Sequence, residues 1–199
     1  MLAVGSLALT GCGQKNQSNP NAGRGGGTTS KSAPLQDLNI KSRDEVKDGG
    51  TVRFSIETLP TMWNALHIDG NSVDLSTTIM GFIGANNFDI AEDGIPKPDT
   101  NYLQSYDVQT NGGKQVVTLH LNPKAKWNSG RTIDYTDYQA TWKATNGANE
   151  DFKMATSDGF NQIESVKKGD KDTDVVITYK GTYPDWTATW SSVMPKEGV

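Results

Sequence analysis

Short stretches of patterned apolar residues begin after residue 48, and each stretch predicts one element. Residues 51–56 read Thr-Val-Arg-Phe-Ser-Ile, which has the two-residue period of a β-strand. Residues 73–85 carry spaced apolar side chains and no proline, which favours a helix. Residues 92–98 contain one glycine and two prolines, a composition typical of a turn.

The clearest pattern is a hairpin, with strands over residues 102–110 and 114–121. The strands flank Asn111-Gly112-Gly113, and Asn-Gly tolerates the positive φ that tight hairpin turns require. In the second strand one face is apolar and consists of Val117, Leu119 and Leu121. His120 points to the opposite, more polar face, where we expect a structural role rather than ligand binding.

A turn over residues 127–131 is followed by a predicted helix. Asp134 is placed to cap this helix, and Asp137 completes a capping-box pattern near the positive helix N-terminus. The helix should end near Asn146-Gly147. One side carries an aromatic stripe that we assign to the core, formed by Tyr135, Tyr138 and Trp142.

A second hairpin is predicted over residues 163–168 and 174–179, around a charged turn at 169–173. Pro184-Asp185 then begins a short helix whose apolar side carries Trp186, Trp190 and Val193. The tryptophans of the folded part are interpreted as structural because each aromatic ring buries roughly 150–250 Å². These four are Trp127, Trp142, Trp186 and Trp190.

The N-terminal stretch has the pattern of a targeting segment. Residues 2–11 form an apolar run of signal-peptide length that ends in Leu9-Thr10-Gly11-Cys12, which resembles a bacterial lipobox. We therefore expect residues 1–11 to be the remnant of a signal peptide, cut short before its basic start, and Cys12 to be lipidated. The alternative is a buried cysteine in a short core segment.

Residues 12–48 are interpreted as the lipidated cysteine followed by a disordered tether. Residues 13–36 are rich in Gly, Ser, Thr, Asn, Gln and Pro, so they cannot bury enough apolar surface to offset ordering entropy. A flexible chain of this length spans roughly 25–30 Å. The folded part is then expected over residues 49–199, held at the outer face of the cell membrane.

Composition excludes several classes of protein. The formal net charge of −4 argues against a nucleic-acid partner. One cysteine and two histidines rule out an internal disulfide and a multi-cysteine metal site, and they leave no nucleophile–base set for an enzyme. No cofactor is expected. The sequence contains no run of 18 apolar residues, so no transmembrane helix is expected.

The first hairpin, the turn and the capped helix together resemble a known signature. Residues 102–142, YLQSYDVQTNGGKQVVTLHLNPKAKWNSGRTIDYTDYQATW, are similar to the signature region of family 5 extracellular solute-binding proteins, the peptide and nickel receptors of ABC importers. Lys124-Ala-Lys-Trp127, Gly130 and Asp137 match this signature, and Asp134 takes the place of its capping threonine. Ser129-Gly-Arg-Thr132 and Ser105-Tyr106 depart from it.

The resemblance extends over residues 49–66 and 165–186, and thus over about 49–197. It implies an α+β (mixed α/β) fold that forms a partial first lobe of a two-lobed, periplasmic-binding-protein-like (type II) fold. Members of the family are normally more than twice as long as this chain. We therefore expect an N-terminal fragment or a truncated product of such a protein.

The resemblance also implies a function, namely capture of oligopeptides or dipeptides outside the membrane and delivery to the permease subunits of an ABC importer. By position, the ligand would meet Ile56, Glu57, Thr58 and Leu59. Glu57 is either suited to contact a ligand amine or is a solvated loop carboxylate. Trp63 is assigned to packing within the core or the loop rather than to contact with a ligand. Two alternatives stay open: a regulatory or scaffolding lipoprotein, and a nickel-binding member, to which His67-Ile-Asp69 gives a faint metal-like spacing.

Overall fold

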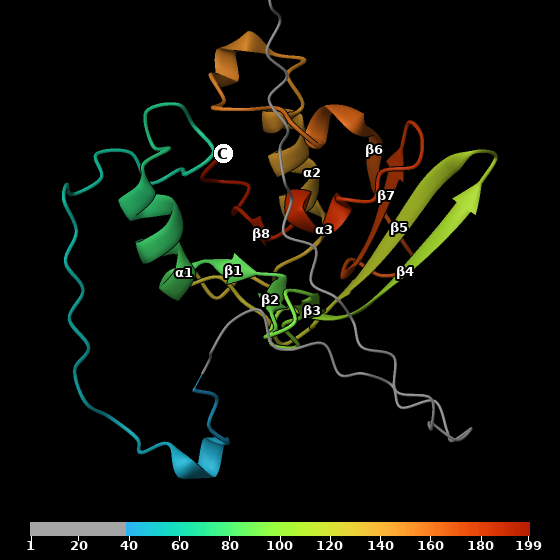
Figure 1. The fold of residues 1–199 in the computed structure, drawn as a ribbon. Coiled ribbons are helices and arrows are strands. Elements are labelled where there is room, and N and C mark those ends of the chain that lie inside the picture. Colours follow the sequence, from blue (N-terminus) through green and yellow to red (C-terminus); the bar gives the residue numbers. More distant parts are fainter. Residues whose placement is uncertain (1–38) are drawn as a thin grey trace, which may run out of the picture. The chain divides into compact units, whose positions relative to one another are not determined.

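The largest element is a four-stranded antiparallel sheet in the order β4–β5–β7–β6 (Figure 1). The computed structural model describes residues 39–199, which belong to one unit of the chain. The strands are β4 (Leu103–Asn111), β5 (Lys114–Leu121), β6 (Ile163–Lys168) and β7 (Asp174–Tyr179). Both predicted hairpins are confirmed. Every second residue of β5 is buried, as the alternating pattern requires.

The turn of the first hairpin differs in one residue from the prediction. Asn111 pairs with Lys114, so the two turn residues are Gly112 and Gly113, with φ of 57° and 79°. Two consecutive positive φ angles match the twist of the strands that the turn connects. Glycine adopts them without steric cost, and the hairpin therefore closes on Gly-Gly instead of Asn-Gly.

Helix α2 (Tyr135–Thr145) lies against β6 and β7 and begins where the capping pattern predicts. Asp134 accepts a hydrogen bond from the Thr136 backbone N–H at 2.8 Å, and the Asp134 N–H donates to Asp137 at 3.1 Å. The helix ends before Asn146, and Gly147 follows with φ of 77°. Tyr138 is buried in the core, whereas the rest of the predicted aromatic stripe is half-buried against it.

The C-terminal segment completes the core. It consists of α3 (Trp186–Thr189) and β8 (Ser192–Val193), and β8 pairs with β1 (Ala85–Asn86). Trp190 is fully buried, with its ring centroid 5.3 Å from those of Tyr138 and Phe160. The predicted apolar side of this segment is confirmed, because Trp186 and Val193 are also buried.

Asn87 joins three parts of the chain in the interior. Its fully buried side chain accepts a hydrogen bond from the Tyr138 hydroxyl at 2.6 Å and donates one to the Trp190 carbonyl at 2.7 Å. Its backbone N–H donates to the Ser191 carbonyl at 2.8 Å. Buried amides of this kind are stable only when they are paired, and Asn87 thus fixes the C-terminal segment against α2.

The remaining elements are short. Residues 74–83 are helical, close to the predicted 73–85, as a π-helical segment η2 (Asp74–Ile79) that runs into α1 (Met80–Ile83). The turn predicted over residues 92–98 is confirmed over 92–94, whereas residues 96–98 form the strand β3 (Pro96–Pro98), which pairs with β2 (Phe88–Ile90). Single helical turns are η1 (Arg43–Glu45), η3 (Glu150–Phe152) and η4 (Phe160–Gln162).

The strand predicted over residues 51–56 is wrong for this structure. These residues are exposed, and no strand within residues 39–199 pairs with them. The alternation of apolar residues is present, but a strand also needs a neighbour for its backbone N–H and C=O groups. Without such a partner, the segment stays irregular.

Most of the N-terminal predictions lie outside the described residues. These include the remnant at 1–11, the lipidation site Cys12 and the larger part of the tether. Within residues 39–199, no helix combines the length and apolar character needed to cross a membrane.

Candidate functional site

The four predicted ligand residues lie together in one exposed loop. Ile56, Glu57, Thr58 and Leu59 are all solvent-accessible. The backbone N–H groups of Glu57 and Thr58 each donate to Oδ2 of Asp74, both at 3.0 Å. Asp74 begins η2, so one carboxylate holds the loop at the start of this helical segment and leaves the four side chains pointing to solvent.

Two cavities of about 480 Å³ and 370 Å³ lie next to each other, with shared walls of Ile83, Ala85, Trp127 and Pro195. The larger one is bounded on its polar side by Lys126, Arg131 and Glu197. The smaller one is mainly apolar and includes Met62, Trp63, Met80 and Met194. None of the four predicted ligand residues lines either cavity. Their loop directly precedes, in the sequence, the residues Met62 and Trp63 that line the smaller cavity.

The turn that carries Trp127 is built by a short hydrogen-bonded ring. The Trp127 N–H donates to the Arg131 carbonyl at 2.9 Å, and the Gly130 N–H donates to the Trp127 carbonyl at 2.8 Å. Gly130 has φ of 85°, a conformation that favours glycine. The predicted turn over residues 127–131 is thus confirmed, and it presents the Trp127 ring to both cavities.

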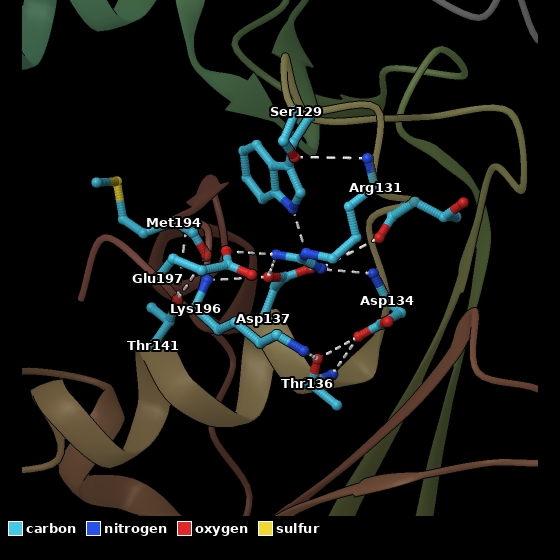
Figure 2. Close-up of polar contacts among 11 residues, drawn as sticks. Ser129, Arg131, Asp134, Thr136, Asp137, Thr141, Met194, Lys196 and Glu197 are labelled. Atoms are coloured by element: carbon cyan, nitrogen blue, oxygen red, sulfur yellow. Dashed lines mark hydrogen bonds and ion pairs between the residues drawn. The ribbon is translucent and has the colours of Figure 1, made fainter.

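Asp137 fixes this wall to the C-terminal segment (Figure 2). Its carboxylate is fully buried and accepts two hydrogen bonds from the Arg131 guanidinium, at 2.6 and 2.9 Å. It also accepts from Nε1 of Trp127 at 3.1 Å and from the Lys196 backbone N–H at 3.0 Å. Arg131 in turn reaches Glu197 at 2.8 Å. One carboxylate therefore joins the helix start, the tryptophan turn and residues 196–197.

In this network one arginine pairs with two carboxylates. Burial alone would raise the pKa of Asp137, but the hydrogen bonds from Arg131, Lys196, Asp134 and Trp127 outweigh it, and the pKa is lowered from its ordinary value. The Arg131 guanidinium also lowers the pKa of Glu197. Both carboxylates are therefore charged at neutral pH, and the arginine of the cavity wall is paired with both of them.

A second charged cluster lies on the polar face of the sheet. His120 is 2.9 Å from Asp174 through Nδ1 and 3.1 Å from Asp107 through Nε2, so it bridges three adjacent strands. Hydrogen bonds to Asp174 and then to Asp107 raise the pKa of His120. The predicted placement on the polar face is confirmed, and both ring nitrogens are engaged in ion pairs.

The His120 pairs predict a pH-dependent stability. A raised pKa means that the stabilisation is fully present below the unfolded value of about 6.5 and is lost as pH rises through the folded value. We expect His120→Gln to lower Tm by about 2–4 °C at pH 5.5, the effect of one or two exposed ion pairs. Thermal denaturation at pH 5.5 to 8.5 should show this difference shrinking with pH, and a difference that grows with pH would contradict the pairing.

No cluster of three or more histidine, cysteine, aspartate or glutamate side chains within residues 39–199 is arranged to hold a metal ion. The segment His67-Ile-Asp69 has the spacing that resembled a metal site. Nδ1 of His67 lies 3.7 Å from the Asp69 carboxylate and accepts a hydrogen bond from the Asp69 backbone N–H. His67 also forms a β-bridge with Met154. Its observed contacts are those of a loop that is tied to its neighbours.

Sequence reasoning located the loop and the tryptophan turn but missed how they are held. Asp137 was predicted only as a capping residue, and Arg131 and Glu197 were not selected. The contact between Arg131 and Asp137 did have a sequence signal, because Arg131 lies only six residues before this capping aspartate. The contact with Lys196 and Glu197 had no such signal, because about 60 residues separate them from Asp137 in the chain.

No protein-family model matches this chain, but its sequence is similar to those of known proteins. The oligopeptide-binding proteins OppA of Mycobacterium bovis and Mycobacterium tuberculosis are each 34% identical over 188 residues. The alignment covers 92% of this chain and 30% of each relative. The chain thus spans less than a third of the length of these proteins.

Solved structures agree on the fold. The periplasmic EDTA-binding protein EppA superposes with a TM-score of 0.61 at 22% identity, over 68% of this chain and 25% of EppA. The oligopeptide-binding protein AppA from Bacillus subtilis, solved with a nonapeptide, gives 0.56 at 18% identity, over 69% of this chain and 26% of AppA. The chain is therefore homologous to a part of the OppA proteins. Its mixed α/β fold corresponds to a part of the type II, periplasmic-binding-protein-like structure of the family 5 solute-binding proteins.

Proposed function

We propose that this chain supplies part of the ligand-capturing lobe of an oligopeptide-binding protein that serves an ABC importer. The observation that carries the proposal is the 34% identity to two OppA proteins over 92% of the chain. The periplasmic EppA and the nonapeptide complex of AppA share the fold, which supports a binding role outside the cytoplasm rather than an enzymatic one.

The loop at residues 56–59 and the two neighbouring cavities supply complementary chemistry for a peptide. The cavities offer apolar walls to side chains, from Trp63, Trp127 and Ile83. Glu57 offers an exposed carboxylate whose own backbone is held by Asp74, so its side chain is available to a ligand amine. Binding sites of this type combine apolar pockets with a few placed polar groups.

Titration with peptides tests this role by NMR, which detects weak binding. Adding a pool of tri- to pentapeptides to the ¹⁵N-labelled chain should shift the amide signals of residues 56–59 and the indole signal of Trp63. The hairpin tip at Gly112 and Gly113 is the internal control and should not shift. Shifts confined to other surfaces, or none at millimolar peptide, would contradict the proposal.

A single variant tests the contact between Glu57 and the ligand amine. Glu57→Gln should weaken binding of peptides with a free N-terminus by about two- to fivefold, which corresponds to an exposed ion pair of roughly 0.4–1 kcal/mol. N-acetylated peptides carry no amine and should bind both proteins equally. Equal losses for free and acetylated peptides would show that Glu57 does not read the amine.

We propose that a lipid attached to Cys12 holds the chain at the outer face of the membrane. Its partners there are permease subunits. Two buried acyl chains anchor a protein stably at about 0.8 kcal/mol per CH₂. When the chain is expressed behind a bacterial lipoprotein signal peptide, Cys12→Ala should move most of it from the membrane to the soluble fraction. Its Tm should stay that of the parent chain. Unchanged membrane partitioning would remove the lipid anchor from the proposal.

A further inference from the structure

We propose that the larger cavity is a carboxylate-binding site in which Glu197 occupies the place of the ligand. Arg131 is the group that a ligand carboxylate contacts, and Glu197 is a built-in competitor that such a ligand displaces. The proposal rests on the function proposed above, because it takes the cavities as the place of the ligand. It goes beyond that function by naming the chemical group that the larger cavity recognises.

The Arg131 guanidinium is held in place from behind. It donates two hydrogen bonds to the fully buried carboxylate of Asp137, at 2.6 and 2.9 Å, and a third to the Thr132 carbonyl at 3.2 Å. A two-point contact between arginine and carboxylate fixes the orientation of the guanidinium plane. Arg131 also lies where the sequence departs from the family signature, at Ser129-Gly-Arg-Thr132, so this group at the cavity wall is a feature of this chain.

The contact between Arg131 and Glu197 is of a different kind. Nη2 of Arg131 donates to one oxygen of Glu197 at 2.8 Å, and Figure 2 shows the guanidinium joined to both carboxylates. The Glu197 side chain is 59% exposed, and Arg131 is the only other residue within 39–199 to which its carboxylate is hydrogen bonded. A single exposed ion pair contributes little to stability, so a ligand carboxylate can replace it. The buried pair of Arg131 with Asp137 stays intact in this exchange.

The charges around the larger cavity favour an anionic ligand. Lys126 and Arg131 line this cavity, and Glu197 is the only acidic residue among the described residues that does so. Asp137 offsets the charge of Arg131, whereas Lys126 has no ion-pair partner in the part of the chain that the structure describes. The hydrogen bond from Arg131 lowers the pKa of Glu197, so the competitor is charged at neutral pH. Once Glu197 has turned to solvent, the charge of Lys126 is left for the ligand.

Pairs of peptides that differ in one carboxylate test the proposal. N-acetyl-trialanine is compared with its C-terminal amide, and an acetylated, amidated peptide with a central glutamate is compared with the same peptide carrying glutamine. Acetylation leaves no amine for Glu57 to contact. The first pair reports on a C-terminal carboxylate and the second on an acidic side chain.

Binding is followed by NMR through the indole signal of Trp127, whose N–H donates to Asp137 beside Arg131. In at least one pair, the peptide with the carboxylate should bind at least threefold more tightly than its neutral partner. The pair that shows this preference identifies the source of the carboxylate. Equal affinities within both pairs would overturn the proposal.

Glu197→Gln is the decisive variant, because it removes the charge of the competitor and leaves Arg131 paired with Asp137. It should strengthen binding of the preferred carboxylate peptide by about two- to fivefold, the range of one exposed ion pair, and leave binding of its neutral partner unchanged. Its Tm should stay within about 2 °C of the parental value, as expected for a surface substitution. Unchanged or weaker binding of the carboxylate peptide would overturn the proposal.

Glu164→Gln is the matched control. It breaks the exposed ion pair with Lys114 on the sheet and changes the net charge of the chain by the same amount, and neither residue lines the two cavities. Because the effect of Glu197 is local, Glu164→Gln should leave the affinity for the carboxylate peptide within the error of the titration. An equal gain in both variants would show a general effect of charge and would overturn the proposal.

The carboxylate site and the proposed peptide binding fail in different ways. If neutral peptides shift the signals of residues 56–59 and Trp63 and carboxylates bring no gain, peptide binding holds and the carboxylate site is wrong. If only carboxylates bind, and they shift the Trp127 indole without the signals of residues 56–59, the carboxylate site holds and peptide binding at the loop is wrong. If no peptide shifts any of these signals at millimolar concentration, both proposals are wrong.

Discussion

Replacing Asp137 with alanine is expected to destabilise the fold by about 3–5 kcal/mol, the cost of leaving a paired charge without its buried partner. The variant removes the acceptor of two Arg131 hydrogen bonds and of the Trp127 indole and Lys196 backbone N–H groups. Domains of this size have total stabilities of about 5–15 kcal/mol. Urea denaturation at pH 7 should therefore show a midpoint lowered by at least about one fifth relative to the parent chain.

A matched control is Asp185→Ala. Asp185 precedes α3, is exposed and makes no side-chain capping hydrogen bond. It should change stability by less than about 0.5 kcal/mol, as is usual for surface substitutions. If Asp185→Ala and Asp137→Ala proved equally destabilising, the network of Asp137 would not be the reason for the loss.

The pH dependence of the Asp137 contribution follows from its lowered pKa. A lowered folded-state pKa gives stability that is present above the unfolded value of about 3.9 and is lost as pH falls through the folded value. The gap between the parent chain and Asp137→Asn should therefore be constant from pH 5 to 8. It should narrow only under more acidic conditions.

Replacing Trp190 with alanine is expected to cost about 3–5 kcal/mol, the range for deleting a large aromatic side chain from a packed core. Trp190 is fully buried against Tyr138 and Phe160. Its loss opens a cavity between α2 and η4 that these neighbours cannot fill without leaving their own packing. Urea denaturation with near-ultraviolet circular dichroism should show the lower stability and the loss of aromatic order.

Trp63 provides the matched control for Trp190. It is 52% exposed and lines the smaller cavity, so Trp63→Ala should lower stability by less than about 1 kcal/mol. This contrast separates a tryptophan that holds the core from one that lines a proposed ligand cavity. Comparable losses at the two positions would show that Trp63 is also a core residue.

The two substitutions with the largest expected effects, at Asp137 and Trp190, act on the same part of the molecule. Asp137 ties residues 196–197 to the tryptophan turn, and Trp190 fixes the preceding residues in the core. The wall formed by Trp127, Pro195 and Glu197 thus stands on two independent anchors. A proposed ligand would meet a wall whose position is set before binding, which lowers the ordering cost of association.

Much of the fold could be predicted from the sequence because its signals are local. Both hairpins, the turn with Gly130, and the start and end of α2 depend on residues a few positions apart. The motif around Trp127 also led to the resemblance to peptide receptors, and the similarity to the OppA proteins agrees with it. The positions of Trp186 and Trp190 on one apolar side followed from the same local spacing.

Long-range contacts were decided only by the tertiary structure. The sequence by itself determined that Asp137 caps a helix, but only the folded chain brings Lys196 and Glu197 to the same cluster. Asn87 gave no sequence signal, since its partners Tyr138 and Trp190 are 51 and 103 residues away. Residues 51–56 show the converse. Their alternation fits a strand, yet a strand exists only where a second segment satisfies its backbone, and within residues 39–199 the tertiary structure supplies none.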